Sequence, residues 1–279
     1  MAQNKTDQAQ HKAAPHETRS HEAKSHEALV GGQFGARASA YLGSAVHAQG
    51  ADLQALADLV RGQSGARVLD LGCGAGHVSF HVAPEVSEVV AYDLSPEMLD
   101  VVAHSASERG LSNIKTRQGV AENLPFAEGS FDYVFSRYSA HHWHDLDAGL
   151  REVARVLKPG GTAAVVDSLS PGAPLLDTYL QTVEVLRDPS HVRSYARTEW
   201  DAALVRAGLM PVASHHFRLR MHFAVWTERM RTPKVQSDAI RALQQAMSET
   251  VTRYFDIDAE GSFDLDIAFI QASSLMRSN

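Results

Sequence analysis

One stretch of the sequence, residues 68–77 with the letters VLDLGCGAGH, constrains the fold more than any other. It is apolar at first, and after Asp70 it carries three glycines at a spacing of two, Gly72, Gly74 and Gly76. Glycine lets the backbone turn sharply and approach a ligand without a Cβ in the way. A strand, a tight turn and a helix N-terminus in succession form a polar cradle at the carboxyl end of an α/β sheet. The stretch therefore predicts a ligand-binding turn in an α/β fold.

The spacing of these glycines differs from that of the turn in nicotinamide- and flavin-dependent enzymes. The dinucleotide-binding turn has its third glycine or alanine one residue later, where helix and strand pack closely. Position 77 of this chain holds a bulky histidine instead. His77 therefore disfavours a nucleotide-dependent oxidoreductase.

Downstream of residue 33 the sequence alternates between strand-like and helix-like patterns. Short β-prone runs lie at 68–71, 88–92, 113–117, 131–136 and 162–167, and helical patterns lie at 52–61, 95–109 and 146–157. We expect residues 158–161 (KPGG) to end the last helix and turn the chain. Apolar strands that alternate with helices predict a doubly wound, mostly parallel sheet with helices on both faces.

The regular alternation of strand-like and helix-like patterns ends after Ser168. A helix is expected from Thr198 to Gly208, and two further strands are expected at 210–221 and 263–272. The remaining segments, 170–196 and 222–261, fit helices that cap the sheet. We expect residues 29–279 to form a single domain.

Residues 1–28 are polar and carry His11, His16, His21 and His26 at steps of five. A metal-binding tail is one interpretation, but a step of five does not keep side chains on one face of a helix. A solvated, disordered tail is the interpretation that we prefer, because the segment has too few apolar side chains to join a core.

Composition narrows the class of protein. The 279 residues carry a net charge of −7, which argues against a dedicated nucleic-acid binder. Cys73 is the single cysteine, so no disulfide can form within the chain. No apolar run reaches the about 18 residues of a membrane span. We therefore expect a cytoplasmic protein without a bound metal ion.

Asp93 is the second candidate ligand-binding residue. It ends the second strand, where a carboxylate can accept hydrogen bonds from both hydroxyls of a ribose. The alternative is that Asp93 caps the next helix, although Ser95 before Pro96 already supplies a cap. The turn after the third strand, residues 119–126, could place backbone amides against an adenine edge.

The ordered set DLGCGAG, YDLSPEML, AENLPF, FDYVFSRYSAHHW and LKPGG resembles the class I S-adenosylmethionine-dependent methyltransferases. It is most similar to the type 11 branch, which is related to the ubiquinone and menaquinone C-methyltransferases. The resemblance covers about residues 33–168. It implies a seven-stranded sheet whose last strand pair is antiparallel, a helical cap, and an N-terminal lid at 33–50. Residues 186–193 (LRDPSHVR) resemble one uncharacterised bacterial subgroup and imply no substrate.

The resemblance also assigns residues to parts of S-adenosylmethionine. Those assigned to the methionine portion are Asp70, Gly72, Cys73, Gly74 and Gly76. Those assigned to the nucleoside and the sulfonium are Asp93 for the ribose, Leu94, Met98 and Ala121 for the adenine, and Ser136 near the sulfur. Val120 and Glu122 are also assigned to the adenine side. Many relatives carry an acidic residue at the position of Val120, so Glu122 is the candidate to accept from the adenine amino group.

Methyl transfer needs little from side chains, because the cofactor carries the reactive group. A base is required only if the acceptor loses a proton during attack. The candidates are His141 and His142, which follow the fourth strand beside Tyr138 and Ser139; alternatively, they only begin the helix that carries Trp143. Weaker candidates for the acceptor pocket are Tyr41, His47, Arg187 and His191.

The sequence thus predicts transfer of a methyl group from S-adenosylmethionine to a small organic acceptor. Within the same enzyme class, a quinone-ring C-methyltransferase or a carboxyl O-methyltransferase remains an alternative. A different class is a non-catalytic S-adenosylmethionine sensor or partner subunit, since the glycine turn and Asp93 fit that function equally well.

Overall fold

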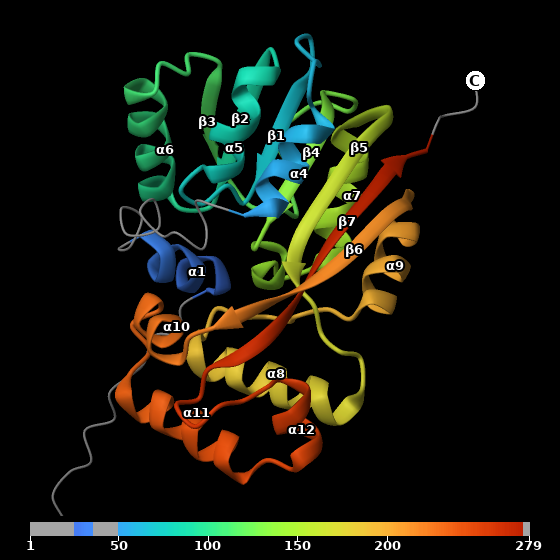
Figure 1. The fold of residues 1–279 in the computed structure, drawn as a ribbon. Helices are drawn as coiled ribbons and strands as arrows, with labels where there is room; N and C mark the ends of the chain where they lie inside the picture. Colours follow the sequence, from blue (N-terminus) through green and yellow to red (C-terminus); the bar gives the residue numbers. More distant parts are fainter. Residues whose placement is uncertain (1–24, 36–49, 276–279) are drawn as a thin grey trace, which may run out of the picture.

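The sheet at the centre of the molecule has the strand order β3-β2-β1-β4-β5-β7-β6 (Figure 1). The computed structural model describes residues 25–35 and 50–275, and its strands are β1 (Arg67–Leu71), β2 (Glu88–Asp93), β3 (Ile114–Gln118), β4 (Phe131–Arg137), β5 (Leu157–Ser168), β6 (Leu209–Met221) and β7 (Phe263–Ser274). Strands β1 to β5 are parallel, and β7 is antiparallel to its neighbours β5 and β6. The predicted doubly wound, mostly parallel sheet is confirmed.

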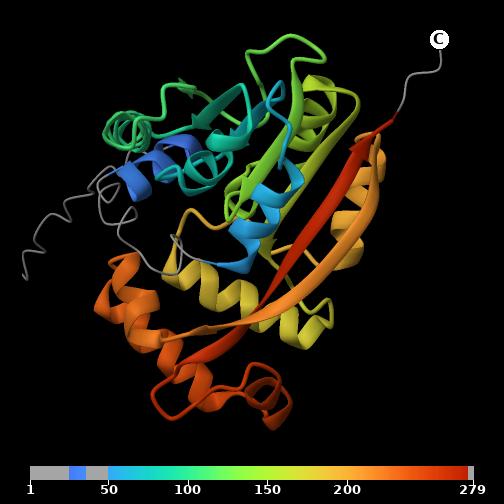
Figure 2. The ribbon, with the colours of Figure 1, turned by 45° about the horizontal axis from the view of Figure 1, so that its top comes forward.

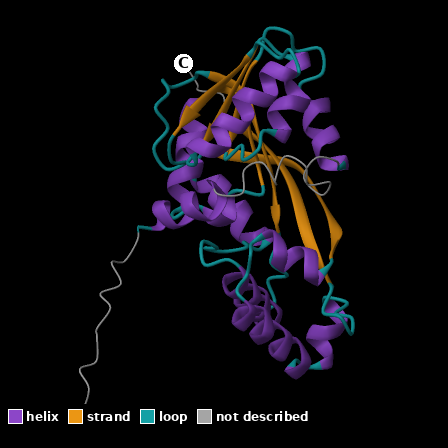
Figure 3. Ribbon diagram, turned by 90° about the vertical axis from the view of Figure 1, so that its left-hand side faces the viewer, coloured by secondary structure: helices purple, strands orange, loops and turns teal. Residues whose placement is uncertain are grey.

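Helices cover both faces of the sheet because alternate strand residues are apolar on both sides (Figure 3). Val68 belongs to a core with α4 (Ala51–Leu59) and α5 (His77–Val82), and the neighbouring α6 (Pro96–Glu108) packs on Phe80 of α5. Leu69 faces the opposite side and belongs to a core with α7 (Leu146–Val156) and α9 (Arg197–Arg206). Between β1 and β4 the strand order reverses, and open α/β sheets bind ligands outside the strand ends at such a point.

One expected turn is absent from its predicted place. Residues 158–161 were expected to form a turn before the fifth strand, but β5 begins at Leu157 and includes them. The pairing of β5 with β4 shifts its register between Phe131 and Tyr133, and Gly160 has a φ of 77°. Lys158 is held to Asp132 of β4 at 2.8 Å, so the irregular segment stays in the sheet.

A helical cap lies beyond the carboxyl ends of the parallel strands (Figures 1 and 2). Its helices are α8 (Pro174–Arg187), α10 (Phe223–Arg229), α11 (Lys234–Ala246) and α12 (Glu249–Tyr254). The long strands β6 and β7 run into this part of the molecule. Leu180 of α8, Trp226 of α10 and Phe263 of β7 are buried in the same core as Val68 of the central sheet. The cap therefore shares a continuous core with the sheet.

Helix α1 (His26–Gly35) lies beside α6 and near α10, close to the ends of the strands (Figures 1 and 2). It includes the last three residues of the segment that we assigned to a disordered tail, so the boundary at 28 was wrong. The remainder of that tail up to residue 24, most of the expected lid at 33–50, and the candidates Tyr41 and His47 lie outside the described residues.

No helix among the described residues is long and apolar enough to cross a membrane.

Candidate active site

The turn between β1 and α5 depends on glycine for two different reasons. Gly72, Gly74 and Gly76 all have positive φ angles, of 69°, 51° and 85°. A Cβ on Gly72 would lie 1.8 Å from the Oγ of Ser139, and a Cβ on Gly76 would lie 2.8 Å from Val102 of α6. A Cβ on Gly74 would meet no atom within 4 Å. Gly72 and Gly76 therefore permit close packing, whereas Gly74 borders open space.

Asp70, at the end of β1, is buried behind this turn. Its Oδ2 accepts hydrogen bonds from the backbone amide of Ser79 at 3.0 Å and from the Ser79 hydroxyl at 2.7 Å. Burial nevertheless raises the pKa of the carboxyl to about 7. A cationic ligand in the adjoining space would favour the ionised form of this group.

Asp93 links the ends of β1 and β2. Its Oδ2 accepts a hydrogen bond from the amide of Gly74 at 2.8 Å, and its Oδ1 accepts one from the amide of Ser95 at 2.9 Å. Burial raises the pKa of Asp93, and these backbone hydrogen bonds oppose the rise. The hydroxyl of Ser95 caps α6 by accepting from the Met98 amide, so Asp93 is not the cap of that helix.

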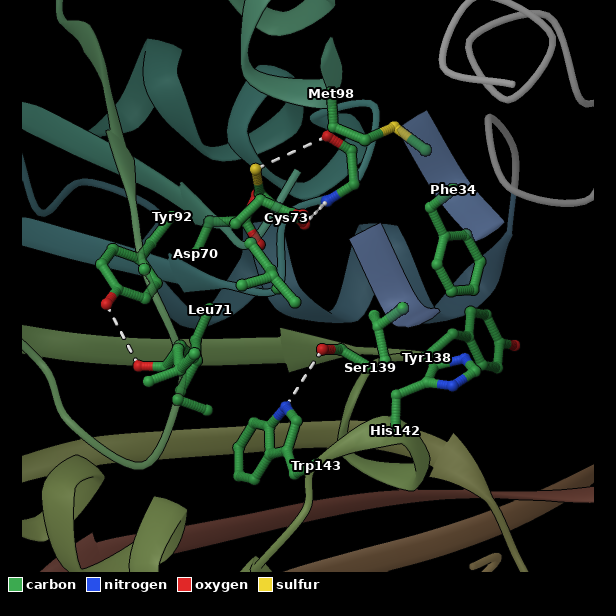
Figure 4. A pocket seen from close by; sticks show the side chains of 18 of the residues that line it. Phe34, Asp70, Leu71, Cys73, Tyr92, Met98, Tyr138, Ser139, His142 and Trp143 are labelled. Carbon is green, nitrogen blue, oxygen red and sulfur yellow. Dashed lines mark hydrogen bonds between the residues drawn. The ribbon is translucent and has the colours of Figure 1, made fainter. Parts of the chain in front are cut away.

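A cavity of about 160 Å³ opens where these strand ends meet (Figure 4). Ten of the residues that we assigned to the cofactor line it: Asp70, Gly72, Cys73, Gly74, Asp93, Leu94, Met98, Val120, Ala121 and Glu122. Other lining residues, which we did not assign to the cofactor, come from α1 and from the segment after β4: His26, Glu27, Val30, Phe34, Trp143 and His144. Helix α1 therefore forms one wall of this cavity, which we call the first cavity.

A second cavity, of about 90 Å³, lies between the strand ends and the cap. Its apolar wall comes from β6, α10 and β7 and includes Met221, Trp226 and Ile267. Its polar wall includes His141, Ser168, Glu184, Arg187 and Asp188. Phe34, Tyr138 and His142 line both cavities. The two cavities therefore adjoin at these three side chains.

His141 lies in the short 3₁₀ helix η2 (Ala140–His142) and is paired with a buried carboxylate. Its Nδ1 is 2.5 Å from the Oδ1 of Asp167, and its backbone amide donates to Oδ2 of the same side chain at 3.2 Å. Burial lowers the pKa of His141, but the charge of Asp167 and the hydrogen bond to it outweigh burial, so the pKa lies above its usual value. No other hydrogen bond to this ring is found among the described residues.

His142 and His191 lie against His141 and differ from it in charge. The ring centroid of His142 is 4.1 Å from that of His141, and the centroid of His191 is 5.7 Å away. Burial lowers the pKa of both rings, and the neighbouring His141 lowers them further. The cluster therefore contains one histidine that is readily charged between two that stay neutral.

Tyr138 is held at the junction in a backbone conformation that costs energy. Its φ is 51°, which is rare for a bulky side chain and costs roughly 1–3 kcal/mol. The preceding Arg137 is ion-paired with Asp52 of α4, and its guanidinium lies 4.7 Å from the centre of the Tyr138 ring. Strain of this kind clusters at functional sites. The buried pair holds the tyrosine between the two cavities.

Comparison with known proteins identifies the class to which this site belongs. A family model described as "Methyltransferase domain" matches residues 69–165. The chain is 53% identical over 201 residues to the uncharacterized protein YafE of Escherichia coli, a match that covers 72% of this chain and 97% of that protein. It is 38% identical over 200 residues to the uncharacterized methyltransferase YcgJ of Bacillus subtilis, covering 72% of this chain and 79% of that protein.

The crystal structure of YcgJ superposes with a TM-score of 0.77 at 34% identity, covering 80% of this chain and 98% of that one. The chain belongs to the class I S-adenosylmethionine-dependent methyltransferases. A demethylmenaquinone methyltransferase of Listeria monocytogenes is also similar, with 34% identity over 149 residues, 51% of this chain and 63% of that protein.

The first cavity of this methyltransferase fits S-adenosylmethionine, the cofactor of the family. The open space beside Gly74 leaves room for a ligand against the turn. Two buried carboxylates, Asp70 and Asp93, border that space, and each has a pKa raised by burial. A sulfonium cofactor with an ammonium group would place positive charge beside these carboxylates and favour their ionised forms. In the described part of the chain, no three metal-ligating side chains are grouped so as to hold an ion.

Two residues that we assigned to the cofactor do not line the methyltransferase's first cavity. Gly76 packs against Val102 of α6 and Phe80 of α5, where a side chain would find no room. Ser136 is buried within β4, and its hydroxyl has no hydrogen-bond partner among the described residues. Ser139, three residues later, lines the cavity instead and accepts a hydrogen bond from the Trp143 indole at 3.2 Å (Figure 4). The lining positions of this segment begin at Arg137, the last residue of β4.

Proposed function

We propose that this methyltransferase transfers the methyl group of S-adenosylmethionine to a small organic acceptor bound in the second cavity, with His141 as the general base. One observation carries the proposal. The second cavity is lined by His141, which is paired with the buried Asp167, and it adjoins the cofactor cavity at Phe34, Tyr138 and His142. A donor and an acceptor that occupy these cavities would lie side by side.

In this proposal the first cavity holds the cofactor through the strand ends. Asp93 binds the ribose, the turn at Gly72 and Gly74 faces the methionine portion, and Leu94 and Met98 flank the adenine. Val120, Ala121 and Glu122 lie along the adenine edge, and Glu122 accepts from its amino group. The bound cofactor supplies an electrophilic methyl group on a sulfonium. Alignment of two reactants by a rigid site can supply about 7–11 kcal/mol of the barrier.

His141 would take the proton that the acceptor loses. A carboxylate only accepts hydrogen bonds, so the 2.5 Å contact with Asp167 places a hydrogen on Nδ1 and leaves the lone pair on Nε2. As the acceptor's oxygen, nitrogen or activated carbon bonds to the methyl carbon, the methyl–sulfur bond would break and leave a neutral thioether, and the proton of the nucleophile would pass to Nε2. The charge of Asp167 stabilises the imidazolium that forms. The raised pKa of His141 supports this role, because a stronger base accepts the proton more readily.

The lining of the second cavity favours an acceptor with an apolar body and an ionisable group. Met221, Trp226 and Ile267 offer an apolar wall, and His141 lies on the polar side. Methylation of a quinone ring is the second candidate, since the reduced ring, a quinol, combines an apolar ring with ionisable hydroxyls and the chain resembles a demethylmenaquinone methyltransferase. A carboxyl acceptor is less favoured, because a carboxylate needs no base.

The test is transfer of a labelled methyl group. Purified protein would be incubated with methyl-labelled S-adenosylmethionine and fractionated extracts or a panel of phenols, quinols and amines. We expect label in a small-molecule product with the wild-type protein and with His104→Gln, whose side chain is exposed on α6. We expect little label with His141→Gln. Cofactor binding without label in any product would instead favour the non-catalytic sensor.

A further inference from the structure

The loop that follows α8 contains a buried turn that the proposed function does not use. It belongs to residues 186–193, the segment that resembles an uncharacterised subgroup. Asp188 is 2% exposed and Ser190 is fully buried. The Oδ1 of Asp188 accepts hydrogen bonds from the Ser190 amide at 2.9 Å and from the Ser190 hydroxyl at 2.6 Å. The amide of His191 donates to the Asp188 carbonyl at 3.0 Å and closes the turn.

This turn reaches from the cap to the histidines after β4. The carbonyl oxygen of Ser190 is 3.0 Å from the Nδ1 of His142, and the Ser190 Oγ is 3.3 Å from the same nitrogen. The amide of Val192 donates to the carbonyl of His141 at 2.8 Å. Both histidines are therefore held by one loop that is distant from them in sequence.

The hydrogen bonds determine which nitrogen of His142 carries the hydrogen. A carbonyl oxygen only accepts, so it requires a hydrogen on Nδ1. A carboxylate also only accepts, so the Ser190 hydroxyl donates its hydrogen to Asp188 and presents a lone pair to Nδ1. Both atoms of Ser190 near this nitrogen are thus acceptors. Nε2, the nitrogen left over, carries the lone pair.

The ring of His142 lies where the two cavities meet. It lines both, and its centroid is 4.9 Å from that of Phe34 in an edge-on contact (Figure 4). Burial and the neighbouring His141 lower the pKa of His142, so the ring stays neutral near pH 7. Its choice of tautomer, and not its charge, therefore decides whether it offers a donor or an acceptor at this place.

We propose that Asp188 and Ser190 are positioning residues that fix His142 in its Nδ1–H tautomer, so that Nε2 accepts a hydrogen bond from the acceptor molecule between the two cavities. The inference rests on the proposed function only for the place where the acceptor binds. It also narrows the substrate class to acceptors that carry a hydroxyl or N–H group at or beside the reacting atom.

The first test needs no acceptor. The ring ¹⁵N shifts of His142 would be recorded in histidine-labelled protein and assigned by their absence from His142→Gln. The wild-type protein should show a protonated Nδ1 and an unprotonated Nε2. In Asp188→Ala the freed Ser190 hydroxyl can donate to Nδ1, so the Nε2–H tautomer should become populated. Asp188→Asn keeps an oxygen that accepts from Ser190 and should restore the wild-type pattern.

Asp188→Ala with native circular dichroism, native cofactor affinity and an unchanged His142 tautomer would overturn the proposal. If Asp188→Ala does not fold, Ser190→Ala decides. It removes the hydroxyl but keeps the carbonyl, and a smaller tautomer change is expected; an unchanged spectrum would then overturn the proposal.

The second test measures turnover once an acceptor is known. We expect kcat of Asp188→Ala to fall roughly 10–100-fold while the KM for the cofactor changes less than about twofold, because a misdirected ring impairs the proton-handling step. A tautomer change in a protein that methylates no acceptor would leave the positioning role standing and contradict the proposed function alone. A tautomer change without loss of kcat would overturn the link to the acceptor.

Discussion

The cofactor half and the acceptor half of this site are built from different kinds of structure. The first cavity is formed largely by turns that follow β1, β2 and β3, where backbone amides and residues such as Asp93 converge. The second cavity is formed by side chains from β5, α8, β6, α10 and β7, which only the folded cap brings together. The first half can therefore be recognised in a short stretch of sequence, whereas the second half exists only in three dimensions.

The largest expected effect is a loss of turnover when His141 is replaced, with cofactor binding kept. Replacing it with Gln removes the group that receives the proton, and turnover should fall about 10²–10⁴-fold. Cofactor affinity should stay within a few fold, because His141 does not line the first cavity. Single-turnover kinetics and calorimetry would measure the two effects. A His141→Gln enzyme with normal turnover would mean that alignment alone accounts for catalysis.

Variants in the first cavity should show the opposite pattern, a loss of cofactor affinity. Gly74→Val places a side chain in the open space of the first cavity, and Asp93→Ala removes a charged hydrogen-bond acceptor, which costs roughly 1.5–3 kcal/mol. Cofactor affinity should fall about tenfold or more in each variant.

Gly62→Val is the matched control for Gly74→Val. Gly62 has a φ of 72° and no neighbour within 4 Å of its Cβ position, and it lies outside both cavities. Gly62→Val therefore introduces the same kind of backbone strain but places no side chain in the first cavity. Equal loss of cofactor binding in the two variants would show that strain, and not occupied space, is the cause.

The pH dependence of turnover should sharpen the contrast. His141 acts as a base only when it is neutral, so kcat should rise with pH through a pKa above the usual value of histidine, about 6.5. Asp167→Asn removes the charge that raises this pKa, so the rising limb should move to lower pH. A pH–rate profile of both enzymes at saturating cofactor would measure the shift. If kcat rises over the same pH range in both enzymes, the His141–Asp167 pair is not the titrating group.

The smallest expected effect concerns stability in the cofactor half. Burial raises the pKa of Asp70 to about 7, above its unfolded value, so the native state without cofactor binds a proton that the unfolded state releases. The stabilisation is full at low pH and is lost as the pH rises through about 7. Asp70→Asn should therefore melt roughly 2–4 °C higher than the wild type at pH 8, with no gain near pH 4. A gain of equal size at both pH values would show that ionisation is not responsible.

The sequence predicted the strands and the first cavity well because both follow from local patterns. The apolar runs at β1 and β2 and the glycines after Leu71 are read directly, and ten of the assigned residues line the cavity. Gly76 and Ser136 do not line that cavity, because position in a motif does not show which way a residue faces. Asp167 ends the strand that was expected at 162–167, yet its pairing with His141 was missed. A carboxylate at the end of the strand beside His141 was the available signal.

The cap and helix α1 were harder to predict. Ser190, which Asp188 holds, contacts His142 across 48 residues of chain, and no local pattern indicates such a pairing. His26 belongs to a polar, repetitive segment, but its Nε2 is 2.8 Å from the His142 carbonyl. Tertiary contacts at the cavity mouth decide the structure there, not the composition of the segment.

The pairing of β6 with β7 has a consequence for how acceptor preference can change. Met221 and Phe263 are partners in the antiparallel register, so the ends of segment 222–262 lie about 5 Å apart. That segment, which contains α10, α11 and α12, thus leaves the sheet and returns to it at neighbouring positions. We expect that this segment can be replaced as a unit. A homologous segment joined at Met221 and Phe263 should change which molecule is methylated and leave the methyl-donor site intact.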